Sequence, residues 1–170
     1  MVNDPSRRTF LRTAPLAAAA TLSLTDTLLA HAQSPATPVP FQLFTAKSLE
    51  EDAKALQAAP GNKTLVENKE IPVTVVMTTE TAKSAKEFEW HEGRDHLVQI
   101  IDGETLYQVG GAPKGGHNTK PAEWLAPESE GSTTYALKKG DMLLIPRSTP
   151  HKRTTTGTVT LILISTNGKP

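Results

Sequence analysis

The side chains best suited to acid–base or metal chemistry are three histidines that lie at the ends of predicted strands. His91 ends one strand, His96 begins the next, and His151 follows a turn that contains two prolines, Pro146 and Pro150. The chain of 170 residues contains no cysteine. That absence excludes disulfides, thiolate metal sites, iron–sulfur clusters and cysteine nucleophiles. The chemistry of this chain therefore depends on imidazole and carboxylate groups.

The segment around His151 resembles the second sequence motif of the cupin superfamily. That motif reads Gly, five residues, Pro, any residue, Gly, two residues, His, three residues, Asn. Here Gly140 is followed by five residues, then by Pro146, and His151 occupies the histidine position. Ser148 replaces the second glycine and Thr155 replaces the asparagine, and neither of those positions is a metal ligand in the family.

The first cupin motif is present with two of its members exchanged. The family motif reads His-x-His, three or four residues, Glu, six residues, Gly. Counting back from Gly103, this chain has His96 where the family has Glu, and His91 at the second histidine position. Glu89 stands at the first histidine position. The order is therefore Glu-x-His-x4-His rather than His-x-His-x4-Glu.

The resemblance implies a metal site formed by Glu89, His91, His96 and His151, with the family's three imidazoles and one carboxylate. Strand alternation places Glu89 and His91 on one face of their strand, so both can point inwards. Such ligands suit Fe, Mn, Ni, Co or Zn as divalent ions, and open positions would admit water, substrate or dioxygen. Glu89 has alternative roles, as acceptor for an imidazole N–H or as general base. The histidines could also be the polar lining of a barrel without metal.

The strand pattern predicts an all-β fold. Short β-branched runs separated by turn residues indicate a closed antiparallel barrel or double sheet over residues 71–165, with a tight turn at Asp102 and Gly103. The cupin resemblance implies a double-stranded β-helix, that is, a jelly-roll barrel. Before it, Ser48 as N-cap and Glu51 predict a helix over residues 49–58 that packs outside the barrel.

A long connection separates the two motifs. Residues 110–132 show no strand period, and such loops are usually lids or binding loops. We expect Trp124 and Leu125 to fold back on the barrel, where they either seal the metal pocket or cover an outer sheet. His117, in the same loop, is expected to be solvated.

Further residues could form the surroundings of the site. Val98, Ile100 and Leu144 are candidates for an apolar wall that contacts a small organic substrate. Arg147 and Lys152 flank His151 and could either meet an anionic substrate at the mouth or form a solvated rim.

The first 32 residues have the pattern of a twin-arginine export signal. Arg7 and Arg8 precede an apolar stretch that ends in a small-x-small cleavage pattern at Ala32. The predicted organisation is a signal peptide over residues 1–32, an N-terminal arm and helix over 33–64, and the cupin domain over 65–170. The mature protein is then expected in the periplasm or outside the cell.

The partners expected for this chain are small molecules. Eighteen basic and 18 acidic side chains give a formal net charge of zero, so no charge excess favours nucleic acid or an anionic membrane. The favoured function is a metal-dependent enzyme of oxygenase, isomerase or lyase type. The alternatives are a non-catalytic periplasmic protein that binds a metal or small ligand, and a structural barrel. The Pro-rich arm over residues 33–40 could cross to a partner in a homodimer.

Overall fold

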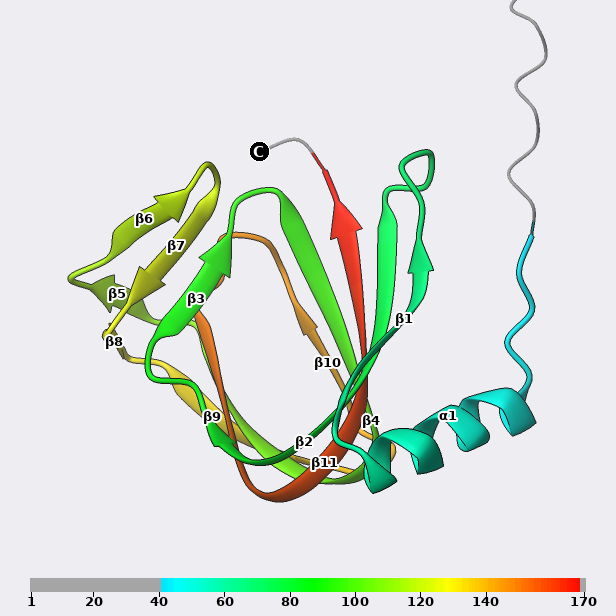
Figure 1. The fold of residues 1–170 in the computed structure, drawn as a ribbon. Coiled ribbons are helices and arrows are strands. Elements are labelled where there is room, and N and C mark those ends of the chain that lie inside the picture. The colour runs from blue at the N-terminus through cyan, green and yellow to red at the C-terminus, as the bar shows by residue number, and fades with distance from the viewer. Residues whose placement is uncertain (1–40, 169–170) are drawn as a thin grey trace, which may run out of the picture. The chain divides into compact units, whose positions relative to one another are not determined.

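The structure is a computed structural model that describes residues 41–168, where one α-helix is followed by eleven β-strands (Figure 1). The predicted all-β class with a short N-terminal helix is confirmed. The twin-arginine signal and the Pro-rich arm lie outside the described residues. Within the described part of the chain, no helix is long and apolar enough to span a membrane.

Two long strands form the centre of the sheet. β4 (Arg94–Val109) and β11 (His151–Asn167) pair in antiparallel fashion along most of their length. On its other side, β11 pairs with β2 (Val73–Ser84) and, through His151, with β3 (Phe88–His91). Figure 1 shows these strands curving, so that the sheet bends around an interior. β11 therefore contributes both to the cavity described below and to the apolar cluster on the outer face of the sheet.

β4 passes through Gly103, where a turn between two strands was expected. That prediction is wrong, because β4 continues through this residue. Gly103 has a φ of 75°, and the register with β11 shifts between Thr154 and Val159. A Cβ atom at Gly103 would lie 2.1 Å from the carbonyl oxygen of Thr158. Glycine is needed here both for the positive φ and for the close approach of the two strands.

The expected closed barrel is an open, curved sheet instead. Hydrogen bonds connect the strands in the order β1-β2-β11-β3-β7-β6, in which β1 spans Gly61–Glu67, β6 spans His117–Lys120 and β7 spans Glu123–Ala126. β9 (Thr133–Lys138) and β10 (Met142–Ile145) pair with β4. The edge strand β1 (Gly61–Glu67) was not predicted. Its sequence is polar at the start and lacks a regular alternation of buried residues, which is the signal that sequence reasoning uses.

The connection between the motifs is not a structureless loop. β5 (Ala112–Lys114) and β8 (Glu128–Glu130) form a separate two-stranded sheet. β6 (His117–Lys120) pairs with β7 (Glu123–Ala126), and β7 pairs with β3. These strands have only three or four residues, and β5 and β6 are exposed throughout, so they carry no hydrophobic period.

The helix begins three residues earlier than predicted. α1 (Ala46–Ala58) has Thr45 as its N-cap, not Ser48. The Thr45 hydroxyl accepts a hydrogen bond from the backbone N–H of Ser48 at 3.1 Å, which satisfies one of the free donors at the helix start. Ser48 instead donates its own hydroxyl to the Thr45 carbonyl at 2.9 Å.

Apolar side chains form two clusters, one on each face of the curved sheet. The outer cluster lies under α1 and has Ala53, Met77 and Ile162 as its buried members. The inner cluster is larger and consists of Val98, Ile100, Tyr107, Leu137, Ile145, Val159 and Leu161. The inner cluster is continuous with the wall of the cavity described below, because Val98, Tyr107 and Ile145 belong to both.

Candidate metal centre

Three histidines from three strands meet on the inner face of the sheet. His91 is the last residue of β3, His96 lies near the start of β4, and His151 is the first residue of β11. One ligand nitrogen from each lies within 4.8 Å of the others. The ring centroids are 4.9 to 5.5 Å apart, and the side chains are 5 to 7% exposed. This spacing would allow one metal ion to contact all three rings.

Each imidazole has a hydrogen-bond partner at its Nδ1 atom. His96 Nδ1 lies 2.9 Å from Ser165 Oγ, and His151 Nδ1 lies 2.9 Å from the carbonyl oxygen of Thr149. His91 Nδ1 lies 2.5 Å from Glu123 Oε2. A carbonyl or carboxylate oxygen can only accept, so Nδ1 carries the proton in His91 and His151. The lone pair of Nε2 is then available to a metal, as in a carboxylate–histidine–metal arrangement.

Arg94 contacts the same histidine. Its Nη2 lies 2.8 Å from His91 Nδ1 and within 2.7 Å of both oxygens of Glu123. Arginine only donates, so a hydrogen bond from Arg94 to Nδ1 would move the His91 proton to Nε2. The carboxylate of Glu123 is the stronger acceptor and lies between both donors, so we assign the proton to Nδ1 and the guanidinium to Glu123.

Burial favours the neutral form of His96 and His151, which is the form that binds metals. Loss of water contact lowers the pKa of His96 to about 3, and the neighbouring His151 and His91 act in the same direction. Burial likewise lowers the pKa of His151. A neutral, buried imidazole with its Nδ1 proton engaged fits a divalent transition metal. The residues present therefore suit the metal that the sequence motifs imply.

Glu89 lies beside the three histidines but is not one of the group that converges. It sits opposite His151 in the sheet, with Oε1 3.6 Å from His151 Nε2, and its side chain is 54% exposed. The carboxylate thus lies on the Nε2 side of His151, within reach of any molecule held there. Its role as fourth ligand or proton acceptor stays a prediction.

A cavity of about 430 Å3 opens next to His96, His151 and Glu89. That size is in the range of small-molecule sites. Of the three residues expected to form its apolar wall, Val98 does so, whereas Ile100 is buried in the inner cluster. Leu144 is 63% exposed, so its assignment is wrong.

The error at Leu144 has a simple cause. Alternation along β10 puts Ile145, and not its neighbour, on the inner face, opposite His96. Ile145 and Leu163 take the place expected for Leu144 and Ile100 in the cavity wall. A shift by one residue therefore changes which face a strand presents.

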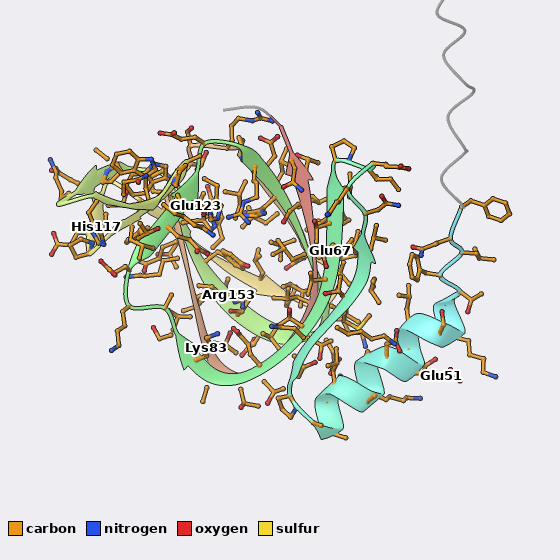
Figure 2. The ribbon with its side chains drawn as sticks, turned by 45° about the horizontal axis from the view of Figure 1, so that its top comes forward. Glu51, Glu67, Lys83, His117, Glu123 and Arg153 are labelled. Atoms are coloured by element: carbon orange, nitrogen blue, oxygen red, sulfur yellow. The ribbon has the colours of Figure 1, made fainter. Side chains whose placement is uncertain are left out.

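The basic residues expected at the mouth lie elsewhere. Arg147 pairs with Asp95, with Nη2 2.7 Å from Oδ2, and Lys152 lies over the ring of Phe88 at 4.6 Å. Neither borders the cavity. The basic residue that does so from β11 is Arg153, which Figure 2 shows inside the curve of the sheet, with Lys83 on the same side.

The tryptophan of the connection packs on the fold rather than on the site. Trp124 stacks on Trp90, with ring centroids 5.7 Å apart, and its Nε1 donates to Glu92 at 3.0 Å. Its neighbour Leu125 borders the cavity. The two residues therefore divide the two expected roles between them. His117 is exposed at the outer hairpin, as expected (Figure 2).

Sequence reasoning missed the groups that orient the histidines. Thr149 lies two residues before His151, but its carbonyl oxygen, not its side chain, is used. Ser165 sits opposite His96 in the β4–β11 pairing, which a correct register would have revealed. Glu123 comes from a short strand with no recognisable pattern, so no signal in the sequence identified it.

The matches found for this chain are to solved structures at low sequence identity. No family model matches the sequence, and no curated protein matches it significantly. Protein BH2720 from Bacillus halodurans matches over 78% of this chain and 85% of its own length, at 18% identity and a TM-score of 0.53. A cupin-like protein from Thermotoga maritima matches over 62% of this chain and 66% of its own, at 21% identity and a TM-score of 0.45. A Klebsiella pneumoniae protein with a double-stranded β-helix domain matches over 76% and 93%, at 14% identity and a TM-score of 0.49.

These likenesses concern the fold alone. The match to BH2720 and the antiparallel topology support the predicted all-β fold. The chemistry of the site has to be argued from this chain's own residues.

Proposed function

We propose that this chain is a metal-dependent enzyme of the cupin fold that acts on a small organic substrate. The observation that carries the proposal is the convergence of three buried imidazoles, His91, His96 and His151, beside a cavity of about 430 Å3. An ion held by three histidines keeps positions for other ligands. A cavity at the same place gives a substrate access to those positions.

The metal, when bound, would supply a Lewis acid or, if it is iron, a centre that binds dioxygen. The chain's own residues would do the rest. Val98, Ile145 and Leu163 form an apolar wall that excludes water from the substrate. Glu89 is the carboxylate in the cavity that lies beside the histidines, and it would either complete the metal site or accept a proton from the substrate.

Metal analysis of variants tests the site. Protein is stripped with a chelator, reloaded in turn with Fe, Mn, Ni, Co and Zn, desalted, and analysed for bound metal. We expect stoichiometric metal in the wild type and loss of it in His96→Ala. His117→Ala is the matched control, because His117 is exposed in β6 and outside the group. Equal metal content in His96→Ala and the wild type would refute the site.

Glu89→Gln separates the two roles of this carboxylate. If Glu89 is a ligand, the variant binds metal more weakly than the wild type, because an amide is a poorer donor than a carboxylate. If Glu89 accepts a proton, metal content stays and turnover falls. A variant that keeps both metal affinity and turnover assigns neither role. A wild type that binds metal but turns over no member of a panel of small organic acids and phenols would favour the non-catalytic binding protein.

We also propose export and pairing. The twin-arginine pattern supports a periplasmic or secreted mature protein, cleaved after Ala32. Replacing Arg7 and Arg8 by Lys should leave the precursor in the cytoplasm, and unchanged export would refute this route. A homodimer is tested by sedimentation of the mature protein at micromolar concentration, where a monomeric mass counts against it.

A further inference from the structure

The cavity has a polar wall that the metal site does not use. Arg153, Glu80 and Tyr107 all border the cavity. Arg153 Nε and Nη2 donate to the two oxygens of Glu80 at 2.8 and 2.7 Å. Arg153 Nη1 donates to the Tyr107 hydroxyl oxygen at 3.1 Å. This bidentate ion pair with Glu80 holds the guanidinium of Arg153 in place, and the guanidinium in turn holds the phenol of Tyr107.

The hydroxyl group of Tyr107 can still donate a hydrogen bond. Tyr107 is 4% exposed, and its oxygen accepts from Arg153. Among residues 41–168, no acceptor is found for its hydroxyl hydrogen. Buried polar groups are almost always paired, by protein or by a molecule held in place. The hydrogen of Tyr107 is therefore available to an acceptor in the cavity.

The position of Tyr107 relative to the histidines follows from the strands. His151 and Arg153 are two residues apart on β11, so both side chains point to the same face, with Cα atoms about 7 Å apart. Tyr107 sits opposite Arg153 in the β4–β11 pairing. The phenol therefore lies one side-chain repeat away from the metal ligand His151. A small molecule can span the two.

The charge at this wall favours an anionic oxygen. Lys83 Nζ lies 3.8 Å from Glu80 Oε2, so Lys83, Glu80 and Arg153 together carry one net positive charge. Lys86 and Glu87, which also border the cavity, cancel each other in charge, and Glu89 lies next to His151 at the metal end. Burial raises the pKa of Tyr107, so the phenol keeps its proton at neutral pH. A neutral O–H donor next to a fixed positive charge suits a carboxylate better than it suits a cation or an apolar group.

We propose that Tyr107 donates a hydrogen bond to a carboxylate of the substrate, at a subsite separate from the metal. Arg153 is the positioning residue, because it holds the phenol, and Glu80 holds Arg153. This inference rests on the proposed function for the other end of the substrate, where a second oxygen meets the metal. The substrate class is then a small organic acid with oxygen groups at both ends.

Succinate and butyrate test the subsite as probes. They have the same carbon chain, and only succinate has a carboxylate at each end. Binding to Co(II)-loaded protein is followed by calorimetry and by the visible absorption of the metal. The variant is Tyr107→Phe, which keeps the ring in the inner cluster. The matched control is Tyr135→Phe, because Tyr135 lies opposite Tyr107 on β9 and does not border the cavity.

The wild type and the control should bind succinate more tightly than butyrate. In Tyr107→Phe we expect succinate affinity to fall about tenfold, which corresponds to about 1.4 kcal/mol. Its Co(II) content and circular dichroism should match the wild type. Equal succinate affinity in wild type and Tyr107→Phe, or no binding of either probe to the wild type, would overturn the proposal.

Failure of the metal site gives a different result. If the wild type holds no Co(II), the proposed function fails by itself. Calorimetry with succinate on the metal-free protein then decides the subsite. Binding that depends on Tyr107 supports it, and absence of such binding overturns it.

Discussion

Replacing Glu123 by Gln should weaken metal binding although Glu123 is not a ligand. Its carboxylate lies between His91 Nδ1 and Arg94 Nη2, at 2.5 Å from the imidazole and 2.5 to 2.7 Å from the guanidinium. Glutamine has nearly the same shape but no charge, and one of its oxygens becomes an N–H2 donor. The substitution therefore removes the charge and one of the two acceptor oxygens, so that His91 Nδ1 and Arg94 Nη2 compete for the remaining oxygen while the packing stays the same.

The size of the effect follows from the loss of orientation. Partners that hold a ligand histidine typically contribute 10- to 100-fold to metal affinity, or about 1.4 to 2.7 kcal/mol. Here the effect should lie at the upper end, because Arg94 is released at the same time and can donate to His91 Nδ1. That contact would place the proton on Nε2, the atom that must bind the metal.

The substitution Glu123→Gln should lower the stability of the metal-free protein by less than it lowers the free energy of metal binding. The Arg94 side chain is 34% exposed and can regain water, so the loss of its ion pair should cost about 1 kcal/mol of unfolding free energy. Arg94 Nε is the one buried side-chain nitrogen or oxygen without a partner among the described residues. The guanidinium is therefore held mainly by Glu123.

Competition with a chelator measures the metal affinity, and urea unfolding of the stripped protein measures stability. Glu130→Gln is the control, because Glu130 pairs with Lys114 at an exposed site. We expect the control to match the wild type in both assays. Unchanged metal affinity in Glu123→Gln, with Glu130→Gln also unchanged, would refute the orientation argument. A loss of affinity fully explained by unfolding would refute it as well.

Three further results are expected. Gly103→Ala should lower the free energy of unfolding by about 3 kcal/mol or more, because its Cβ would meet the Thr158 carbonyl. Gly140→Ala has open space around its Cβ and should lower it by about 1 kcal/mol. Urea unfolding measures both, and equal losses would contradict this prediction. Trp124→Ala should lower the unfolding free energy by about 2 kcal/mol, because the half-buried stack on Trp90 is lost. Metal content should stay unchanged. Loss of metal would show that Trp124 shapes the metal site. The metal-free protein should lose stability as pH falls from 6.5 towards 3, because the unfolded chain protonates His96 before the folded chain does. A His96→Gln variant should show a shallower dependence of unfolding free energy on pH. An identical slope would refute the lowered pKa of His96.

The three histidines were predictable because they stand in local motifs. Each lies at a strand end that turn residues mark in the sequence, and the spacing from Gly103 and from Gly140 fixes their order. Residues that act through long-range contacts were not predictable in this way. Glu123 is 32 positions from His91, and Ser165 is 69 positions from His96.

The wall of the cavity shows a second limit. Leu144 and Ile145 are equally apolar, and only the register between β10 and β4 decides which faces inwards. The short strands between residues 112 and 130 show a third limit. They are held by backbone hydrogen bonds, because β7 pairs with β3 and β5 pairs with β8. Their side chains therefore carry little of the hydrophobic pattern that identifies strands.

The pairing of β11 with three other strands has a consequence for synthesis. β11 is the common partner of β2, β3 and β4, and it carries His151, Arg153 and Ser165. While the ribosome is still making the chain, the earlier strands lack the strand that joins them. They then expose apolar edges and faces that a chaperone can bind. The metal site and the cavity can form only once β11 has been made, because it supplies His151 and Arg153. A chain cut short before β11 keeps His91 and His96 but lacks the third imidazole, so a metal ion distinguishes molecules that contain β11 from those that do not.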